Sequence, residues 1–154
     1  MSDYTATVTW ARDGAVFTDG KYSRTYLISF DGGVSIAGSA SPHVVRAPLS
    51  KADAADPEEL LVAAVSSCHM LFFLDFARRG GFTVDRYQDE AVGVMEKDDR
   101  GRTSITKVTL RPAVSWSGEK QPSPEDIDDL NHRAHEACYI ANSIRAEVLV
   151  EART

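Results

Sequence analysis

Two cysteines are the residues of this sequence with the most distinctive chemistry. Cys68 lies in the middle of a long apolar segment, and Cys138 lies in the last quarter of the chain. Free cysteine is among the most buried residue types, so the residues alone favour an inert core thiol at Cys68. A reactive Cys68 needs a cation beside it, because burial raises a thiol pKa. An arginine meets that requirement best, since it is always charged and holds anions in a planar fork.

The first residues of the chain bear on the redox state of these thiols. The start, Met1 to Thr5, lacks a basic stretch followed by an apolar one, so we predict no signal peptide and a cytoplasmic protein. A stable structural disulfide would be unusual in that reducing compartment. The two cysteines are therefore either inert core thiols or working thiols, and their spacing alone does not say whether they meet.

The segment that carries Cys68 has the signals of a long helix. Asp56 can cap it, Pro57 suits its first turn, and Glu58 and Glu59 lie where the helix dipole favours anions. The paired glycines after Arg79 predict its end. Its middle is apolar on nearly every face, which predicts a helix covered by a sheet on one side and by a second subunit on the other.

The same apolar stretch is a poor membrane span. A span needs about 20 apolar residues without polar breaks. Here residues 60–77 are interrupted by Ser66, Ser67, His69 and Asp75. We therefore predict a buried helix and no membrane partner.

The other segments predict strands and one more helix. The β-branched, aromatic and turn residues place strands at 4–10, 26–30, 34–37, 82–96, 104–116 and 144–150. A second helix is predicted from Ser123-Pro124-Glu125-Asp126 to about Ala137. This order lacks a regular βαβ alternation, so we predict an α+β fold in a single domain over 1–154.

Composition narrows the range of partners. Of the 154 residues, 43% are hydrophobic and 26% are charged, which is typical of a soluble globular protein. The formal net charge of −6 argues against nucleic-acid binding, which needs a concentrated basic surface.

Two segments together resemble one known family. They are DPEELLVAAVSSCH at 56–69 and AHEACYIANS at 134–143. They resemble the two cysteine-bearing signatures of the OsmC/Ohr family of osmotically inducible and organic hydroperoxide resistance proteins, in a variant branch with Cys-His-Met. The resemblance spans essentially the whole chain and its order of elements.

The resemblance implies a fold and an activity. The fold is α+β, with antiparallel sheets, two main helices and an intertwined homodimer whose sites lie at the interface. The activity is a thiol-dependent peroxidase: Cys68 reduces an organic hydroperoxide to an alcohol, and Cys138 resolves the sulfenic acid to a disulfide. An external thiol then reduces that bond, and no metal, haem or flavin is required.

The resemblance also implies residues that assist Cys68. Glu58 matches the family's glutamate, which holds the activating arginine. Ten helical residues span about 15 Å, so Glu58 cannot touch Cys68 of its own helix and must come from the partner or act through an arginine. Its alternative role is a first-turn charge. Arg12, in Arg-Asp-Gly, is our preferred activating arginine; Arg24 is the alternative and Arg46 a third possibility.

Histidines and a second function complete the alternatives. His69, His132 and His135 could be metal ligands with the cysteines, but lone histidines at helical spacing are more often core or polar-face residues, so we predict no metal site. His69 could instead hydrogen-bond at the interface or tune Cys68. The alternative function is a catalytically weak stress protein that binds a small apolar or electrophilic molecule in the dimer-interface cleft.

Overall fold

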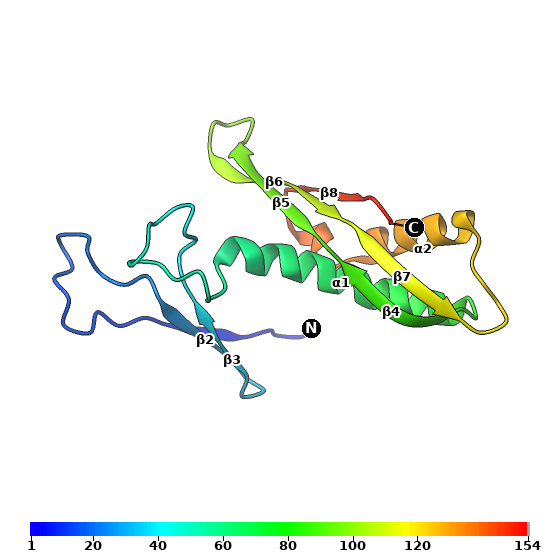
Figure 1. Ribbon diagram of the computed structural model, residues 1–154, viewed down its shortest axis with the longest axis horizontal. Coiled ribbons are helices and arrows are strands. Elements are labelled where there is room, and N and C mark those ends of the chain that lie inside the picture. The colour runs from blue at the N-terminus through cyan, green and yellow to red at the C-terminus, as the bar shows by residue number, and fades with distance from the viewer. Residues whose placement is uncertain (154) are drawn as a thin grey trace. The chain divides into compact units, whose positions relative to one another are not determined.

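The computed structural model describes residues 1–153 and divides the chain into two compact units, Met1–Leu60 and Leu61–Thr154. Along the chain, helices and strands follow one another without a regular βαβ alternation, so the predicted α+β class is confirmed. Figure 1 shows the elements and their labels.

The first unit contains a three-stranded antiparallel sheet. Its strands are β1 (Ala6–Thr9), β2 (Tyr26–Phe30) and β3 (Ser35–Gly38), in that order across the sheet. The strands predicted at 26–30 and 34–37 form a hairpin around Asp31-Gly32-Gly33, where Gly33 has φ +83°, which a glycine adopts without strain. β1 is shorter than the predicted strand at 4–10.

Helix α1 (Pro57–Arg79) begins and ends where the sequence predicts. The Glu59 N–H donates to Asp56 Oδ1 at 2.8 Å, and the Asp56 N–H donates to Glu59 Oε2 at 3.1 Å, so both ends of a capping box are made. At the other end Gly81 has φ +77°, and the Phe82 N–H donates to the Ala77 carbonyl at 3.0 Å.

The second unit contains a long bent ribbon in place of the two predicted strands 82–96 and 104–116. Four strands form it: β4 (Thr83–Asp89), β5 (Val92–Lys97), β6 (Thr103–Leu110) and β7 (Pro112–Ser117). β4 pairs with β7 and β5 with β6, all antiparallel. β4 leads into β5 and β6 into β7, with a break at the same level on both sides (Figure 1).

The break in the ribbon lies at Arg111 and Pro112, where the residue pattern predicted a continuous strand. Pro112 has no N–H to donate to a ladder. The Arg111 N–H donates instead to the Asp89 side chain at 2.5 Å. The Leu110 carbonyl accepts from the Glu151 N–H at 2.8 Å, so β6 pairs with the C-terminal segment up to the break. The prediction of two unbroken strands was therefore wrong at their midpoints.

The chain ends with a helix and a strand that close the core of this unit. Helix α2 (Pro124–Ala137) begins at the predicted Ser123 cap, whose side chain accepts from the Asp126 N–H. A short 3₁₀ turn, η1 (Ala141–Ser143), leads to β8 (Glu147–Val150), which pairs with β6 in parallel. The strand predicted at 144–150 is thus shorter by three residues at its start.

Residues 61–79 of α1 pack in the core of the second unit. Every fourth residue is buried, and the stripe consists of Val65, His69, Phe73 and Ala77. By length and composition alone α1 could also cross a membrane. The buried stripe is typical of a core helix, so it favours the predicted buried helix over a membrane span.

Candidate functional site

Cys138 lies at the point where α2 ends and the chain turns toward η1. It is 1% exposed and caps the helix, with its N–H donating to the His135 carbonyl at 3.2 Å. The Ala141 N–H lies 3.4 Å from its Sγ, and the Val65 carbonyl of α1 lies 4.0 Å from the same sulfur. The second cysteine is therefore held directly against the helix that carries the first.

The structure brings the two thiols together. Both cysteines are unpaired thiols; Cys68 is half-buried and Cys138 is buried. The pKa of Cys138 is raised, first by its burial and further by a hydrogen bond with, and the charge of, Cys68, while the Ala141 N–H acts in the opposite direction. The Cys138 thiol is therefore mostly protonated at neutral pH and interacts with the Cys68 thiol. The spacing of the cysteines had left this question open.

His69, the next residue after Cys68, makes a contact that the sequence did not predict. Its side chain is 1% exposed, and its Nε2 lies 3.1 Å from Asn131 Oδ1 on α2. The pKa of His69 is lowered, mainly because burial disfavours the charged imidazolium. The one sequence signal for Asn131 is its polar side chain on the apolar side of an amphipathic helix.

A second polar contact ties α1 to the break in the ribbon. The Ser66 hydroxyl donates to Asp89 Oδ2 at 2.5 Å, and the other oxygen of Asp89 accepts the Arg111 N–H. Nearby, burial raises the pKa of Tyr87 beyond that of an ordinary phenol, with the Asp89 charge adding to the effect. These contacts fix the face of α1 on the side of β4.

Glu58 lies in the first unit, in the first turn of α1. Its Oε2 is buried and has no hydrogen-bond partner among residues 1–153. The pKa of Tyr26 is raised by burial and then by the charges of Asp56 and Glu58, which places this acidic helix start near the Tyr26 ring. A buried carboxylate oxygen without a partner is uncommon and fits a residue that receives a cation.

The three candidate arginines all lie in the first unit, whereas both cysteines lie in the second. Arg12 is exposed, and its guanidinium donates to the Ala15 carbonyl at 2.9 Å, across a turn in which Asp13 has φ +49°. Arg24 is more committed: its guanidinium stacks 3.7 Å from the Tyr22 ring centroid and donates to the Gly20 and Tyr22 carbonyls. Arg46 is exposed. The choice of activating arginine remains a prediction.

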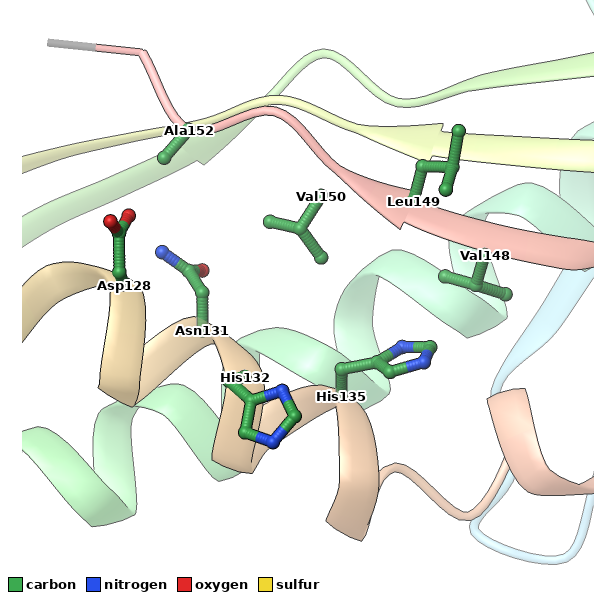
Figure 2. A pocket seen from close by; sticks show the side chains of 8 residues that line it. All are labelled: Asp128, Asn131, His132, His135, Val148, Leu149, Val150 and Ala152. Carbon is green, nitrogen blue, oxygen red and sulfur yellow. The ribbon is translucent and has the colours of Figure 1, made fainter.

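His132 and His135 line a pocket of about 280 Å³ between α2 and β8 (Figure 2). His132 is exposed and His135 half-buried, while Val148, Leu149 and Val150 form the opposite wall. Within residues 1–153, no group of three or more His, Cys, Asp or Glu side chains is arranged to hold a metal ion.

Comparison with known proteins identifies the fold. A protein of the same fold, an OsmC-like protein of unknown function from Vibrio cholerae, is 50% identical, with 99% of this chain and 100% of that chain covered and a TM-score of 0.98. The organic hydroperoxide resistance protein OhrB of Bacillus subtilis is 23% identical, with coverage of 97% and 98% and a TM-score of 0.69. An organic hydroperoxide resistance protein from Elizabethkingia anophelis is 18% identical, with coverage of 99% and 94% and a TM-score of 0.70. These last two show likeness of fold.

The family is established by a separate match. No curated protein sequence matches this chain. The family model for OsmC-like protein matches residues 50–153, which include α1, both cysteines and the whole of the second unit up to Arg153. The chain therefore belongs to the OsmC-like protein family.

Proposed function

We propose that this protein is a thiol-dependent peroxidase that reduces organic hydroperoxides in the cytoplasm and works as a homodimer. One observation carries the proposal: the buried Cys138 thiol lies against α1, with its Sγ 4.0 Å from the Val65 carbonyl, and interacts with the half-buried Cys68 thiol of that helix. An inert core has no need for such a pair, whereas a two-step thiol cycle requires it. Membership of a family that includes organic hydroperoxide resistance proteins supports the same reading.

The proposed cycle begins at the more accessible cysteine. The Cys68 thiolate attacks the outer oxygen of the hydroperoxide, the O–O bond breaks, and the departing alkoxide takes a proton to become an alcohol. Cys68 is left as a sulfenic acid. The Cys138 thiol then attacks the Cys68 sulfur; the S–S bond forms, the S–O bond breaks, and water leaves with the thiol proton. Two equivalents of an external thiol return both cysteines to the reduced state.

In this proposal an arginine stabilises the Cys68 thiolate and Glu58 orients the arginine. The orphan Oε2 of Glu58 is a suitable acceptor for a guanidinium. Because Glu58 lies ten residues before Cys68 on one helix, we propose that it serves the cysteine of the partner subunit or acts through the length of Arg12.

The apolar setting of Cys68 suggests the substrate class. Phe72 is half-buried and Leu71 is 63% exposed on the same helix, so a substrate at Cys68 would meet hydrocarbon surface. A hydroperoxide that buries roughly 100 Å² more apolar surface than hydrogen peroxide would gain about 2.5 kcal/mol. We therefore expect bulky alkyl hydroperoxides to react roughly 50 to 100 times faster than hydrogen peroxide.

Counting thiols tests the proposal. One equivalent of cumene hydroperoxide should remove both free thiols of the wild-type protein. Cys138→Ser should instead stop at a Cys68 sulfenic acid that dimedone labels. Survival of both thiols after several equivalents of every hydroperoxide would overturn the peroxidase and leave the alternative, a weakly catalytic protein that binds a small apolar or electrophilic molecule. Equal rate constants for cumene hydroperoxide and hydrogen peroxide would refute the apolar site alone.

A further inference from the structure

We infer that His69 and Asn131 are positioning residues: their buried hydrogen bond sets the alignment of α2 on α1 and thereby the rate at which Cys138 closes a disulfide onto Cys68. The inference rests on the proposed function for its biological meaning, because it assigns a role in the resolving step. It concerns neither the attack on peroxide nor the choice of arginine.

The two residues lie on the two cysteine-bearing helices. His69 directly follows Cys68 on α1, and Asn131 lies seven residues before Cys138, the residue that caps α2. Asn131 contacts His69 and Cys138 contacts Val65, so both side chains face α1. The 3.1 Å contact between His69 Nε2 and Asn131 Oδ1 therefore joins the helices on the face that presents Cys138 to α1.

The direction of this hydrogen bond is fixed by its neighbours. The Asn131 Nδ2 group donates to the Ile127 carbonyl at 3.0 Å, which leaves Oδ1 as the acceptor toward His69. His69 must then donate from Nε2. Burial keeps the imidazole neutral, so Nδ1 carries a lone pair, and Nδ1 has no partner within residues 1–153. Within residues 1–153, the imidazole of His69 therefore makes its hydrogen bond through Nε2, to Asn131.

The surrounding contacts cannot set the alignment by themselves. Around this bond the two helices meet through Phe73 and Ala77 of α1 and Leu130 and Ala134 of α2. Apolar contacts are non-directional and tolerate small sliding movements, whereas a hydrogen bond weakens steeply when its distance or angle changes. The hydrogen bond between His69 and Asn131 is a buried, directional contact between the two helices, and it therefore favours a single register.

Register matters for the second chemical step far more than for the first. Peroxide attack uses Cys68 on α1, and a small movement of α2 leaves that sulfur in place. Disulfide closure needs the two Cβ atoms about 3.5–4.5 Å apart, with a defined S–S torsion, so it depends on both helices. A displacement of Cys138 by 1 Å would slow closure on the order of a hundredfold.

An aromatic disulfide, dithiobis(nitrobenzoate), separates the two steps without any peroxide. Cys68 attacks the reagent, forms a mixed disulfide and releases one coloured thiolate. Cys138 then attacks the Cys68 sulfur, forms the S–S bond and releases the second thiolate. The second release is unimolecular, and its rate constant measures closure. Cys138→Ser should release only one equivalent.

The decisive comparison is between two amides at residue 69. Gln places its N–H where the imidazole has Nε2, and Asn places its N–H where the imidazole has Nδ1. We expect His69→Gln to close within about threefold of wild type and His69→Asn to close at least about tenfold more slowly, with the first release unchanged in both. Asn131→Leu, which keeps the volume and removes the acceptor, should behave like His69→Asn.

Three outcomes would overturn the inference: equal closure in the Gln and Asn variants, equal slowing of both releases, or an NMR spectrum of the wild-type imidazole with the proton on Nδ1 or on both nitrogens. The NMR arm needs no reactive cysteine and decides the hydrogen bond even if the Asn variant fails to fold. Because no peroxide is used, normal closure in a protein that ignores hydroperoxides would refute the peroxidase and leave this inference intact.

Discussion

Arg12 and Arg24 differ in how strongly their present contacts hold them. Arg24 is stacked on Tyr22 and donates to two carbonyls, whereas Arg12 is exposed and makes one local contact to Ala15. If the guanidinium turns toward a thiolate, Arg12 loses one hydrogen bond, whereas Arg24 loses two hydrogen bonds and its stacking on Tyr22. This difference supports Arg12 as the activating residue.

We predict that Arg12→Ala lowers the rate constant of Cys68 oxidation by about a hundredfold for every peroxide alike, because a fixed cation acts on the thiolate and not on the substrate tail. Stopped-flow measurement with cumene hydroperoxide and hydrogen peroxide tests this. Lys21→Ala, at another exposed cation of the first unit, is the matched control and should react as wild type. A full rate in Arg12→Ala together with a slow Arg24→Ala would transfer the role to Arg24.

His69 also makes stability depend on pH. Its pKa is lowered in the folded protein, whereas an unfolded histidine titrates near pH 6.5, so below that pH the unfolded chain binds more protons. The free energy of unfolding should thus be highest above about pH 6.5 and fall toward acid, by at most about 1.4 kcal/mol per pH unit from this residue.

Urea unfolding of wild type and His69→Gln between pH 5 and 8 measures this contribution. The difference between their unfolding free energies should shift across that range in favour of the Gln variant at acid pH, because glutamine does not titrate. Parallel pH profiles for the two proteins would mean that His69 has an ordinary pKa in the folded state.

At the scale of elements, the β2–β3 hairpin contains a close packing contact. Gly38 pairs with Tyr26, and a Cβ built on Gly38 would lie 2.1 Å from a carbon of the Tyr26 ring. The ring therefore covers the glycine. Since Tyr26 also lies near the acidic start of α1, this contact helps to fix the surroundings of Glu58.

We predict that Gly38→Ala lowers the free energy of unfolding by about 1–3 kcal/mol, because the Tyr26 ring has to move. Gly32→Ala is the control in the same hairpin, since a Cβ there has no atom within 4 Å and its φ is not in the left-handed region. Thermal or urea unfolding compares them. Equal stability of the two variants would show that the ring moves without cost.

At the scale of the molecule, the single chain leaves much apolar surface uncovered. Leu71 in the middle of α1 is 63% exposed and Tyr139 after α2 is 71% exposed. Large apolar side chains left exposed on a core helix and beside it are typical of association sites. It agrees with the proposal that a second subunit covers the outer face of α1.

We predict a stable dimer at micromolar concentration. Leu71→Lys should weaken it and shift the mass toward the monomer, because an ammonium group cannot be buried without a partner. Glu119→Lys introduces the same side chain at an exposed position in the turn before α2 and should leave the dimer intact. Multi-angle light scattering across a dilution series measures both; a folded wild-type monomer at these concentrations would refute the prediction.

Local signals determined α1, α2 and the first hairpin, since caps, turn glycines and apolar periodicity act within a few residues. The α+β class and the OsmC-like family also followed from the sequence, because the residues around Cys68 and Cys138 form two specific motifs. The interruption of the ribbon was missed, although Pro112 offered a signal within the expected strand. Its cause, the Asp89 carboxylate that takes the Arg111 N–H, acts across 22 residues.

Only the tertiary structure decided which distant groups meet. Cys138 could have lain anywhere along α1, and its contact with Cys68 depends on how α2 crosses that helix. The bond between His69 and Asn131 also depends on how the helices cross. A buried polar side chain requires a hydrogen-bond partner, but the sequence does not specify which residue it is. Sequence thus determined the reactive groups and their helices, and packing between the helices determined their pairs.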